Sequence, residues 1–166
     1  AVARQIALAL DVGADAGWRH GALHPRDVLV DTTGRVRVTG IGIAQLVERF
    51  GAKPPRRRPY GAPERAPGQP WDARADVFAL AVIAAEWLAP RRSRPGTEPL
   101  AETLARAGFD GDAAVRVLEA ATSANSTDRP PTATALVEAL AAAIDLERVA
   151  RSRTPASGSL FATIDP

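Results

Sequence analysis

The longest apolar run of the chain covers residues 77–90 (VFALAVIAAEWLAP) and sets the first constraint on the fold. It is shorter than the roughly 20 residues that a membrane-spanning helix needs, and it contains Glu86. We therefore predict a helix over residues 72–89, with Asp72 as its N-cap and Pro90 beyond its end. No membrane span is expected within this chain.

The composition favours a small helical domain. Aromatic residues make up only 5% of the 166 residues, so the core must rest on Ala, Leu, Val and Ile, which suits closely packed helices. The length suffices for one domain with one core. Cysteine is absent, which excludes disulfides and Cys-based metal sites. The three tryptophans, Trp18, Trp71 and Trp87, are expected in the core or at an interface.

Charge and leader sequence bear on partners and location. The formal net charge is only +2, whereas a nucleic-acid-binding face is usually much more basic, so we expect no nucleic-acid partner. Basic runs at residues 53–58 and 91–94 could meet phosphate or an anionic surface, but a solvated loop is the simpler interpretation. No charged-then-apolar leader opens the sequence. We expect a cytoplasmic location, as a free protein or as the cytosolic part of a membrane protein.

Periodicity, turn residues and prolines divide the chain into elements. Residues 28–38 predict two short strands joined by a Gly-containing turn. Residues 40–65 contain four prolines and no long period, which predicts an extended loop. Further helices are predicted at residues 2–16, 98–107, 112–121 and 132–149. The prediction is a mainly helical domain over residues 1–149 with one small β-hairpin, followed by a flexible tail or linker over residues 150–166.

Five short motifs follow one another along the chain. Residues 20–30 read HGALHPRDVLV, residues 36–44 VRVTGIGIA, residues 60–64 YGAPE, residues 76–81 DVFALA and residues 128–130 DRP. In this order and at these distances they resemble the catalytic loop, the metal-binding turn, the end of the activation segment, the start of the long buried helix and the final turn of bacterial serine/threonine protein kinases. The resemblance implies the C-terminal lobe of a protein-kinase-like fold, with the N-terminal lobe absent from this chain.

The resemblance breaks at the positions that carry the chemistry. Phosphoryl transfer needs a carboxylate that orients the attacking hydroxyl, and a carboxylate with an Asn that hold Mg²⁺. By the resemblance, Ala22 takes the position of the catalytic Asp and Gly40 that of the metal-binding Asp. His24 takes the position of the catalytic-loop Lys, and Asp27 that of the metal-binding Asn. Neither Ala22 nor Gly40 can accept a proton or coordinate an ion.

A phosphorylation switch and a complete nucleotide pocket are also missing from the pattern. Gly21 stands where the family has the Arg that pairs with a phosphorylated activation loop, and residues 43–63 contain no Ser or Thr. The family's glycine-rich loop and phosphate-pairing Lys would lie before Ala1. Leu29 and Asp27 would then leave only the floor of the pocket, so we expect neither ATP nor Mg²⁺ as a cofactor.

Residues 20–30, here called the catalytic-type loop, and the following Asp31 contain histidines and acids that also have simpler interpretations. His20 and His24 lie four residues apart but in a predicted loop without a third ligand, so we expect no metal site. His24 is then expected to face solvent. Asp27 and Asp31 flank a short strand, and we interpret them as a solvated edge and a turn residue.

The resemblance implies structural roles for five residues. His20 and Ile41 should stack in the apolar column that crosses the lobe. Asp76 should accept hydrogen bonds from the backbone of the catalytic-type loop, and Glu64 should pair with Arg129.

Three interpretations follow. The first is a catalytically inactive pseudokinase lobe that binds a protein partner as a scaffold in signalling. The second is a diverged, ATP-dependent serine/threonine kinase whose N-terminal lobe lies outside this chain and whose base would be Asp27. The third is a fragment without a selected function.

Overall fold

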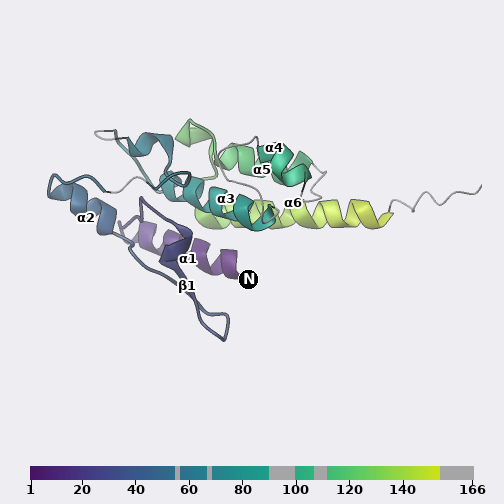
Figure 1. The fold of residues 1–166 in the computed structure, drawn as a ribbon, viewed down its shortest axis with the longest axis horizontal. Coiled ribbons are helices and arrows are strands. Elements are labelled where there is room, and N and C mark those ends of the chain that lie inside the picture. Colours follow the sequence, from purple (N-terminus) through teal and green to yellow (C-terminus); the bar gives the residue numbers. More distant parts are fainter. Residues whose placement is uncertain (55–56, 67–68, 90–99, 107–111, 154–166) are drawn as a thin grey trace, which may run out of the picture.

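Six α-helices, three short 3₁₀ helices and one pair of antiparallel strands make up the described part of the chain. The computed structural model describes residues 1–54, 57–66, 69–89, 100–106 and 112–153. The molecule is elongated, and α6 runs along much of its length (Figure 1). The elements are α1 (Val2–Asp15), η1 (Pro25–Asp27), β1 (Val28–Val30), β2 (Val36–Val38), α2 (Ile43–Arg49), η2 (Pro63–Arg65), α3 (Arg74–Leu88), α4 (Leu100–Ala105), α5 (Asp112–Ala121), η3 (Ser126–Asp128) and α6 (Ala133–Arg153).

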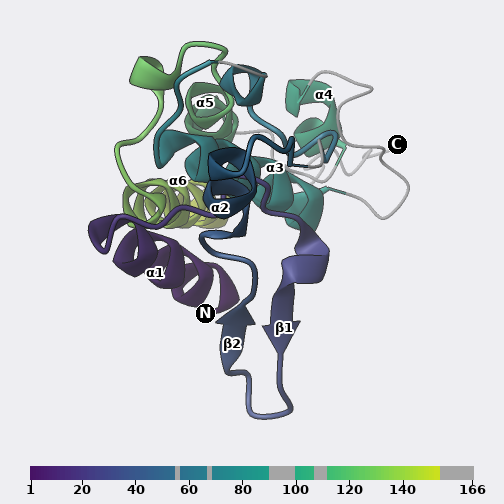
Figure 2. The ribbon, with the colours of Figure 1, turned by 90° about the vertical axis from the view of Figure 1, so that its left-hand side faces the viewer.

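Helix α3 lies at the centre and is buried on nearly every side, because its central turns carry almost only apolar side chains. Val77, Leu80 and Ile83 are each at most 1% exposed. Helices α1, α4, α5 and α6 pack against it, and the end-on view shows them gathered around α3 (Figure 2). A helix that is apolar all round must be buried. The helix begins two residues after Asp72, whose carboxylate still accepts the backbone N–H of Arg74 at 2.8 Å.

The remaining core comes from α1, α5 and α6. Their apolar stripes meet each other and α3, and contribute the buried side chains Ile6, Leu10, Leu118, Leu136 and Leu140. Helix α5 has the predicted bounds, whereas α6 continues four residues past the predicted end at residue 149. Ala and Arg in residues 150–153 are good helix formers, and the first proline of the expected tail comes only at Pro155. The rest of that tail, residues 154–166, lies outside the described residues.

The β-hairpin is docked on α1 through one glutamine. Strands β1 and β2 pair antiparallel with Val28 opposite Val38 and Val30 opposite Val36. The side chain of Gln5 donates to the Gly34 carbonyl at 2.9 Å and accepts the Val36 N–H at 3.0 Å. Figure 2 shows the strands beside α1, with the turn extending away from the helices.

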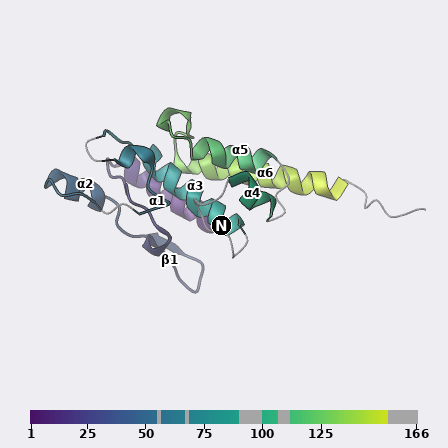
Figure 3. The same ribbon diagram turned by 45° about the horizontal axis from the view of Figure 1, so that its top comes forward.

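The structure corrects the prediction for residues 40–65 and narrows that for two tryptophans. The segment over residues 40–65, which was predicted as a loop, contains the seven-residue helix α2. This helix is too short to show a helical period, and it ends before Pro54, the first proline of the segment. Helix α2 lies at the end of the molecule opposite the C-terminal end of α6 (Figure 3). Trp18 and Trp87, which were predicted in the core or at an interface, are 44% and 48% exposed, so neither is a core residue and the interface stays a prediction. Helix α4 is described over Leu100–Ala105 only, and the basic run at residues 91–94 lies outside the described residues.

Among the described helices, none combines the length and the apolar character that a bilayer crossing requires.

Asp11 on α1 caps the start of α6. Its two carboxylate oxygens accept the backbone N–H groups of Ala133 at 2.9 Å and Thr134 at 2.8 Å. The hydroxyl of Thr132 accepts the N–H of Ala135 at 3.0 Å. Because the first N–H groups of a helix have no partner within the helix, these bonds satisfy them and fasten α6 to α1.

We expect Asp11→Ala to lower the free energy of unfolding by about 1–2 kcal/mol, since it removes a cap from α6. Urea unfolding monitored by circular dichroism measures this loss. Asp15→Ala removes an exposed acid from the same helix and should change the free energy by less than about 0.5 kcal/mol. Equal effects of the two substitutions would contradict the capping role of Asp11.

Candidate functional site

The candidate site is built on the loop between α1 and β1, which a buried carboxylate holds in place. The backbone N–H groups of His20 and Gly21 donate to the two oxygens of Asp76 at 2.8 and 2.7 Å. Burial raises the pKa of the Asp76 carboxyl, and the hydrogen bonds from Gly21 and His20 act in the opposite direction. Since Asp76 lies in the first turn of α3, the loop is fixed to the central helix of the fold.

The two positions that were expected to lack carboxylates differ in their surroundings. Ala22 is half-buried and lines a hollow together with Gly21, Pro54 and residues 57–65. Gly40 has a φ of +87°, in the left-handed region that favours glycine, and a Cβ at this position would lie 3.3 Å from His20 Nε2. Any side chain at residue 40 would therefore be strained by its backbone and crowded by the imidazole of His20.

Asp27 has several partners within the loop and beyond it. Its Oδ2 accepts the backbone N–H of His24 at 3.0 Å and lies 3.5 Å from His20 Nε2. Arg57 Nη1 lies 3.4 Å from Oδ1 and 3.5 Å from Oδ2. The interpretation of Asp27 as a solvated strand edge was wrong, because η1 turns its carboxylate back toward the loop. Asp31, in contrast, is exposed and closes the hairpin turn, where it accepts two backbone N–H groups and one hydroxyl.

The two histidines have different environments. His20 is buried, and neither of its ring nitrogens hydrogen-bonds to the described residues. His24 was expected to face solvent, but it is half-buried. Its Nδ1 accepts the N–H of Arg26 at 3.1 Å, and its ring meets that of Tyr60 edge-on, with 4.8 Å between centroids. Pro25 begins η1, which makes His24 the N-cap and turns its ring toward the backbone. Within the described ranges, no group of three or more His, Cys, Asp or Glu gathers that could hold a metal ion.

Ile41 and Leu29 lie at the edges of the site. The side chain of Ile41 packs against Gly13 of α1 and lines a shallow apolar hollow with Trp18 and Leu46. Its stacking on His20 stays a prediction. Leu29 on β1 is exposed, so the expected floor of a nucleotide pocket is open to solvent.

Trp71 fills the space beside Gly21. Gly21 has a φ of +68°, and a Cβ there would come within 2.5 Å of the Trp71 ring. The guanidinium of Arg65 lies over the same ring, 3.7 Å from its centroid, and its Nε donates to the Gly21 carbonyl at 2.7 Å. Glu48 accepts from Arg65 Nη2 at 2.8 Å and from Trp71 Nε1 at 3.0 Å. Gly21 stands where the resemblance places an Arg that would pair with a phosphorylated activation loop. The space beside Gly21 is filled by the stacked side chains of Trp71 and Arg65, which nothing in the motifs indicated.

We expect Gly21→Ala to be more destabilising than Gly34→Ala. Both glycines have positive φ, which costs an alanine about 1–2 kcal/mol, but Gly34 has open space around its Cα. At Gly21 the methyl group also meets Trp71, which should add about 1–3 kcal/mol of overpacking. Urea unfolding of the two variants measures the difference. Equal losses of stability would show that Trp71 moves aside without cost.

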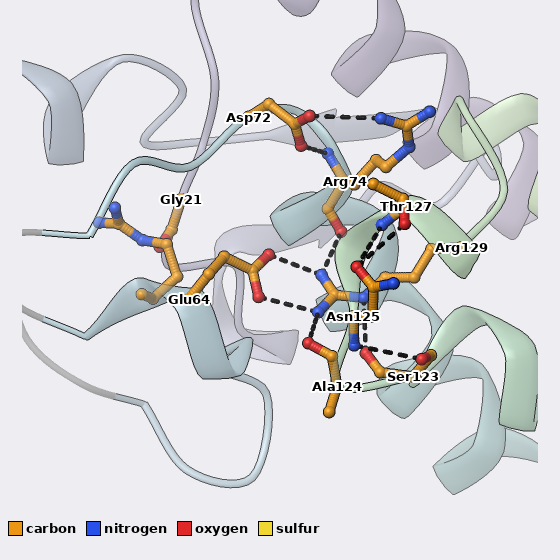
Figure 4. Close-up of polar contacts among 10 residues, drawn as sticks. Gly21, Glu64, Asp72, Arg74, Ser123, Ala124, Asn125, Thr127 and Arg129 are labelled. Carbon is orange, nitrogen blue, oxygen red and sulfur yellow. Dashed lines mark hydrogen bonds and ion pairs between the residues drawn. The ribbon is translucent and has the colours of Figure 1, made fainter.

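Arg129 joins three segments below the loop (Figure 4). Its side chain is 0% exposed, and Nη1 and Nη2 donate to the two carboxylate oxygens of Glu64 at 2.6 and 2.8 Å. Nη1 also donates to the Arg74 carbonyl at 3.1 Å, and Nε donates to the Ser123 carbonyl at 2.8 Å. The guanidinium lies 5.0 Å from the centroid of the Phe78 ring. One buried charge thus links η2, the start of α3 and the segment that follows α5.

We expect Glu64→Gln and Arg129→Met each to lower the free energy of unfolding by about 3–5 kcal/mol, because either change strands a buried charge. The double variant should lose less than the sum, by about 1–3 kcal/mol. A double-mutant cycle by urea unfolding tests both values. A single-variant loss below about 1 kcal/mol would be typical of an exposed ion pair and would contradict the role of this one.

Known proteins with similar sequences include bacterial serine/threonine protein kinases. No protein-family model matches the chain. The probable serine/threonine-protein kinase PknB of Lactococcus lactis is 30% identical over 122 residues, which cover 68% of this chain and 16% of that protein. The serine/threonine-protein kinase PknA of Mycobacterium tuberculosis is 31% identical over 99 residues, which cover 55% of this chain and 22% of that protein.

Solved structures with a similar fold include the kinase domain of PknI from Mycobacterium tuberculosis. One crystal structure of that domain superposes with a TM-score of 0.65 at 25% identity, and the match covers 86% of this chain and 53% of the other. A second has a TM-score of 0.62 at 27% identity and covers 87% and 54%. The chain thus spans about half of the crystallised domain and less than a quarter of either curated relative.

Proposed function

We propose that this chain, which has a protein-kinase-like fold and is related to bacterial serine/threonine kinases, binds a protein partner and does not transfer phosphate. The observation that carries the proposal is the absence of a carboxylate at both positions where phosphoryl transfer needs one, Ala22 and Gly40. The proposed role is that of a pseudokinase scaffold in signalling.

The surroundings of Gly40 support a settled loss of the metal-binding carboxylate. An Asp at residue 40 would have to adopt a positive φ and approach the imidazole of the buried His20. Similarly, Trp71 leaves no room for a side chain at Gly21. The packing around residues 21 and 40 thus suits glycine at both positions, which supports the proposal.

Asp27 is a poor substitute for the missing carboxylates. One of its oxygens already accepts the His24 N–H, and the Arg57 guanidinium lies beside both oxygens. These contacts leave fewer lone pairs for a proton or a metal ion. They also give Asp27 a structural role in closing η1, which explains an acid at this position without catalysis.

An exposed apolar area supports the binding of a protein. Trp18, Ile43, Leu46 and Phe50, on and next to α2, are all exposed large hydrophobic residues. Trp18, Ile43 and Leu46 line the same shallow hollow, so at least these three lie together. Apolar side chains that gather on a surface mark sites of interaction.

The second candidate function is that of a diverged kinase completed by an N-terminal lobe outside this chain. The sequence relationship to PknB and PknA favours it, and Asp27 would be its base. The two functions differ in whether labelled phosphate is transferred from ATP.

The assay uses the protein together with any sequence encoded upstream of residue 1, so that an N-terminal lobe would be included. We expect no transfer of radiolabelled phosphate from ATP with Mg²⁺ to protein substrates above the background of a protein-free sample, because two carboxylates of the mechanism are missing. Asp27→Ala should give the same result as the unchanged chain. An active serine/threonine kinase assayed in parallel controls for the substrates. ATP with Mg²⁺ should likewise leave the melting temperature unchanged.

Transfer that Asp27→Ala abolishes would refute the proposal and establish the diverged kinase.

A further inference from the structure

We propose that the hollow over Ala22 binds the phosphoryl group of a phosphorylated serine or threonine side chain on a protein partner. The inference rests on the proposed function, because a kinase active at this site would present an unphosphorylated hydroxyl here. The hollow lies between Gly21 and Ala22 on one side and Pro54 and residues 57–65 on the other, and its cavity volume is about 150 Å³. A water molecule takes about 30 Å³ in the liquid, so several waters or one phosphoryl group fit.

The lining of the hollow is basic. Among the described residues, the lining includes Arg57, Arg58 and Arg65 together with small residues and prolines, and no acidic side chain. Ala22 contributes only a methyl group at the place where the resemblance implies an Asp. An Asp there would repel an anion, whereas the present lining attracts one. A phosphoryl group carries a charge of about −1.5 to −2 at neutral pH and three strong acceptor oxygens.

The three arginines differ in how far they are already engaged. Arg58 is exposed and makes no hydrogen bond or ion pair within the described part of the chain. Arg57 lies 3.4 Å from the Asp27 carboxylate, which is long for a charge-assisted hydrogen bond of about 2.7–2.9 Å. Both side chains can therefore turn to an incoming anion.

Arg65 forms a fixed wall of the hollow. It is held by Glu48, by the Gly21 carbonyl and by stacking on Trp71, so little of its side-chain freedom remains to be lost on binding. Guanidinium groups can meet phosphate oxygens through two parallel hydrogen bonds, which a lysine cannot do. The hollow thus combines one preorganised cation with two adaptable ones.

A groove next to the hollow fits a polypeptide. It has a volume of about 690 Å³ and shares Pro54 and Arg65 with the hollow. Its remaining lining mixes apolar and polar side chains, including Ala66, Pro70, Trp71, Lys53 and Gln69. An extended peptide could lie along this groove with its phosphorylated side chain in the hollow. The net charge of only +2 argues against a nucleic acid as the source of the phosphate.

The test uses peptides with one fixed phosphoserine or phosphothreonine between randomised residues, and the same peptides after dephosphorylation. We expect the phosphorylated peptides to bind the chain about tenfold more tightly or better, as measured by fluorescence anisotropy. Arg58→Gln and Arg57→Gln should each reduce this binding by about tenfold. Arg37→Gln removes the same charge from an exposed site on β2 and should leave the affinity unchanged.

Equal binding of phosphorylated and dephosphorylated peptides would overturn the inference, as would the absence of binding. Inorganic phosphate that binds as tightly as the phosphorylated peptides would assign the hollow to free phosphate and overturn the protein partner. The melting temperature of Arg58→Gln is the control for folding. If it equals that of the unchanged chain, the variant is folded and a loss of affinity comes from the missing guanidinium.

The same preparation is assayed for phosphate transfer from labelled ATP. Transfer would refute the proposed function itself. A chain that neither transfers phosphate nor distinguishes phosphorylated peptides would refute this inference alone.

Discussion

The arrangement of the site depends on the hydrogen bonds that the buried guanidinium of Arg129 donates. A fully buried charge is tolerated only when its hydrogen bonds are satisfied, and Arg129 finds its acceptors in three separate segments. Glu64 belongs to η2, the Arg74 carbonyl to the start of α3, and Ser123 to the turn after α5. Because all three must keep their places to satisfy one side chain, η2 cannot move independently of the helical core.

Two anchors hold the loop of the candidate site. One is η2, which Arg129 fixes through Glu64, and the other is Asp76. Glu64 holds η2, and the neighbouring Arg65 donates to the carbonyl of Gly21. Asp76 accepts the N–H of the same Gly21 and that of His20. The catalytic-type loop is therefore fixed by α3 and by η2 together, and neither anchor involves Ala22 or Gly40. The shape of this loop therefore does not depend on a carboxylate at residue 22 or residue 40.

The parts of this structure that follow from local pattern could be predicted from the sequence, and those that depend on tertiary contact could not. The bounds of α1, α3 and α5 and the hairpin came within two residues of prediction because each has its own periodicity or turn residue. Glu64 and Arg129, which the structure joins across 65 positions, were paired by the resemblance to the kinase family and not by a local pattern. Helix α2 has too few residues to show a period. The Trp71–Arg65 stack fills a space that exists only because residue 21 is glycine, and no spacing rule encodes such an exchange.

The polar network also bears on whether the chain is a fragment without function. Asp11, Asp76 and Arg129 each lie at a place where loss of one partner would leave a buried polar group unsatisfied, at a cost of about 1–3 kcal/mol. A domain has only about 5–15 kcal/mol of stability in total, so a few such losses would unfold it. In the described part of the chain these three networks are present, while Ala22 and Gly40 stand where the resemblance to kinases implies carboxylates. Changes without selection would fall on both sets alike. Under the proposed function the changes are confined to the positions of the chemistry, which favours a chain that is kept folded for the proposed binding role.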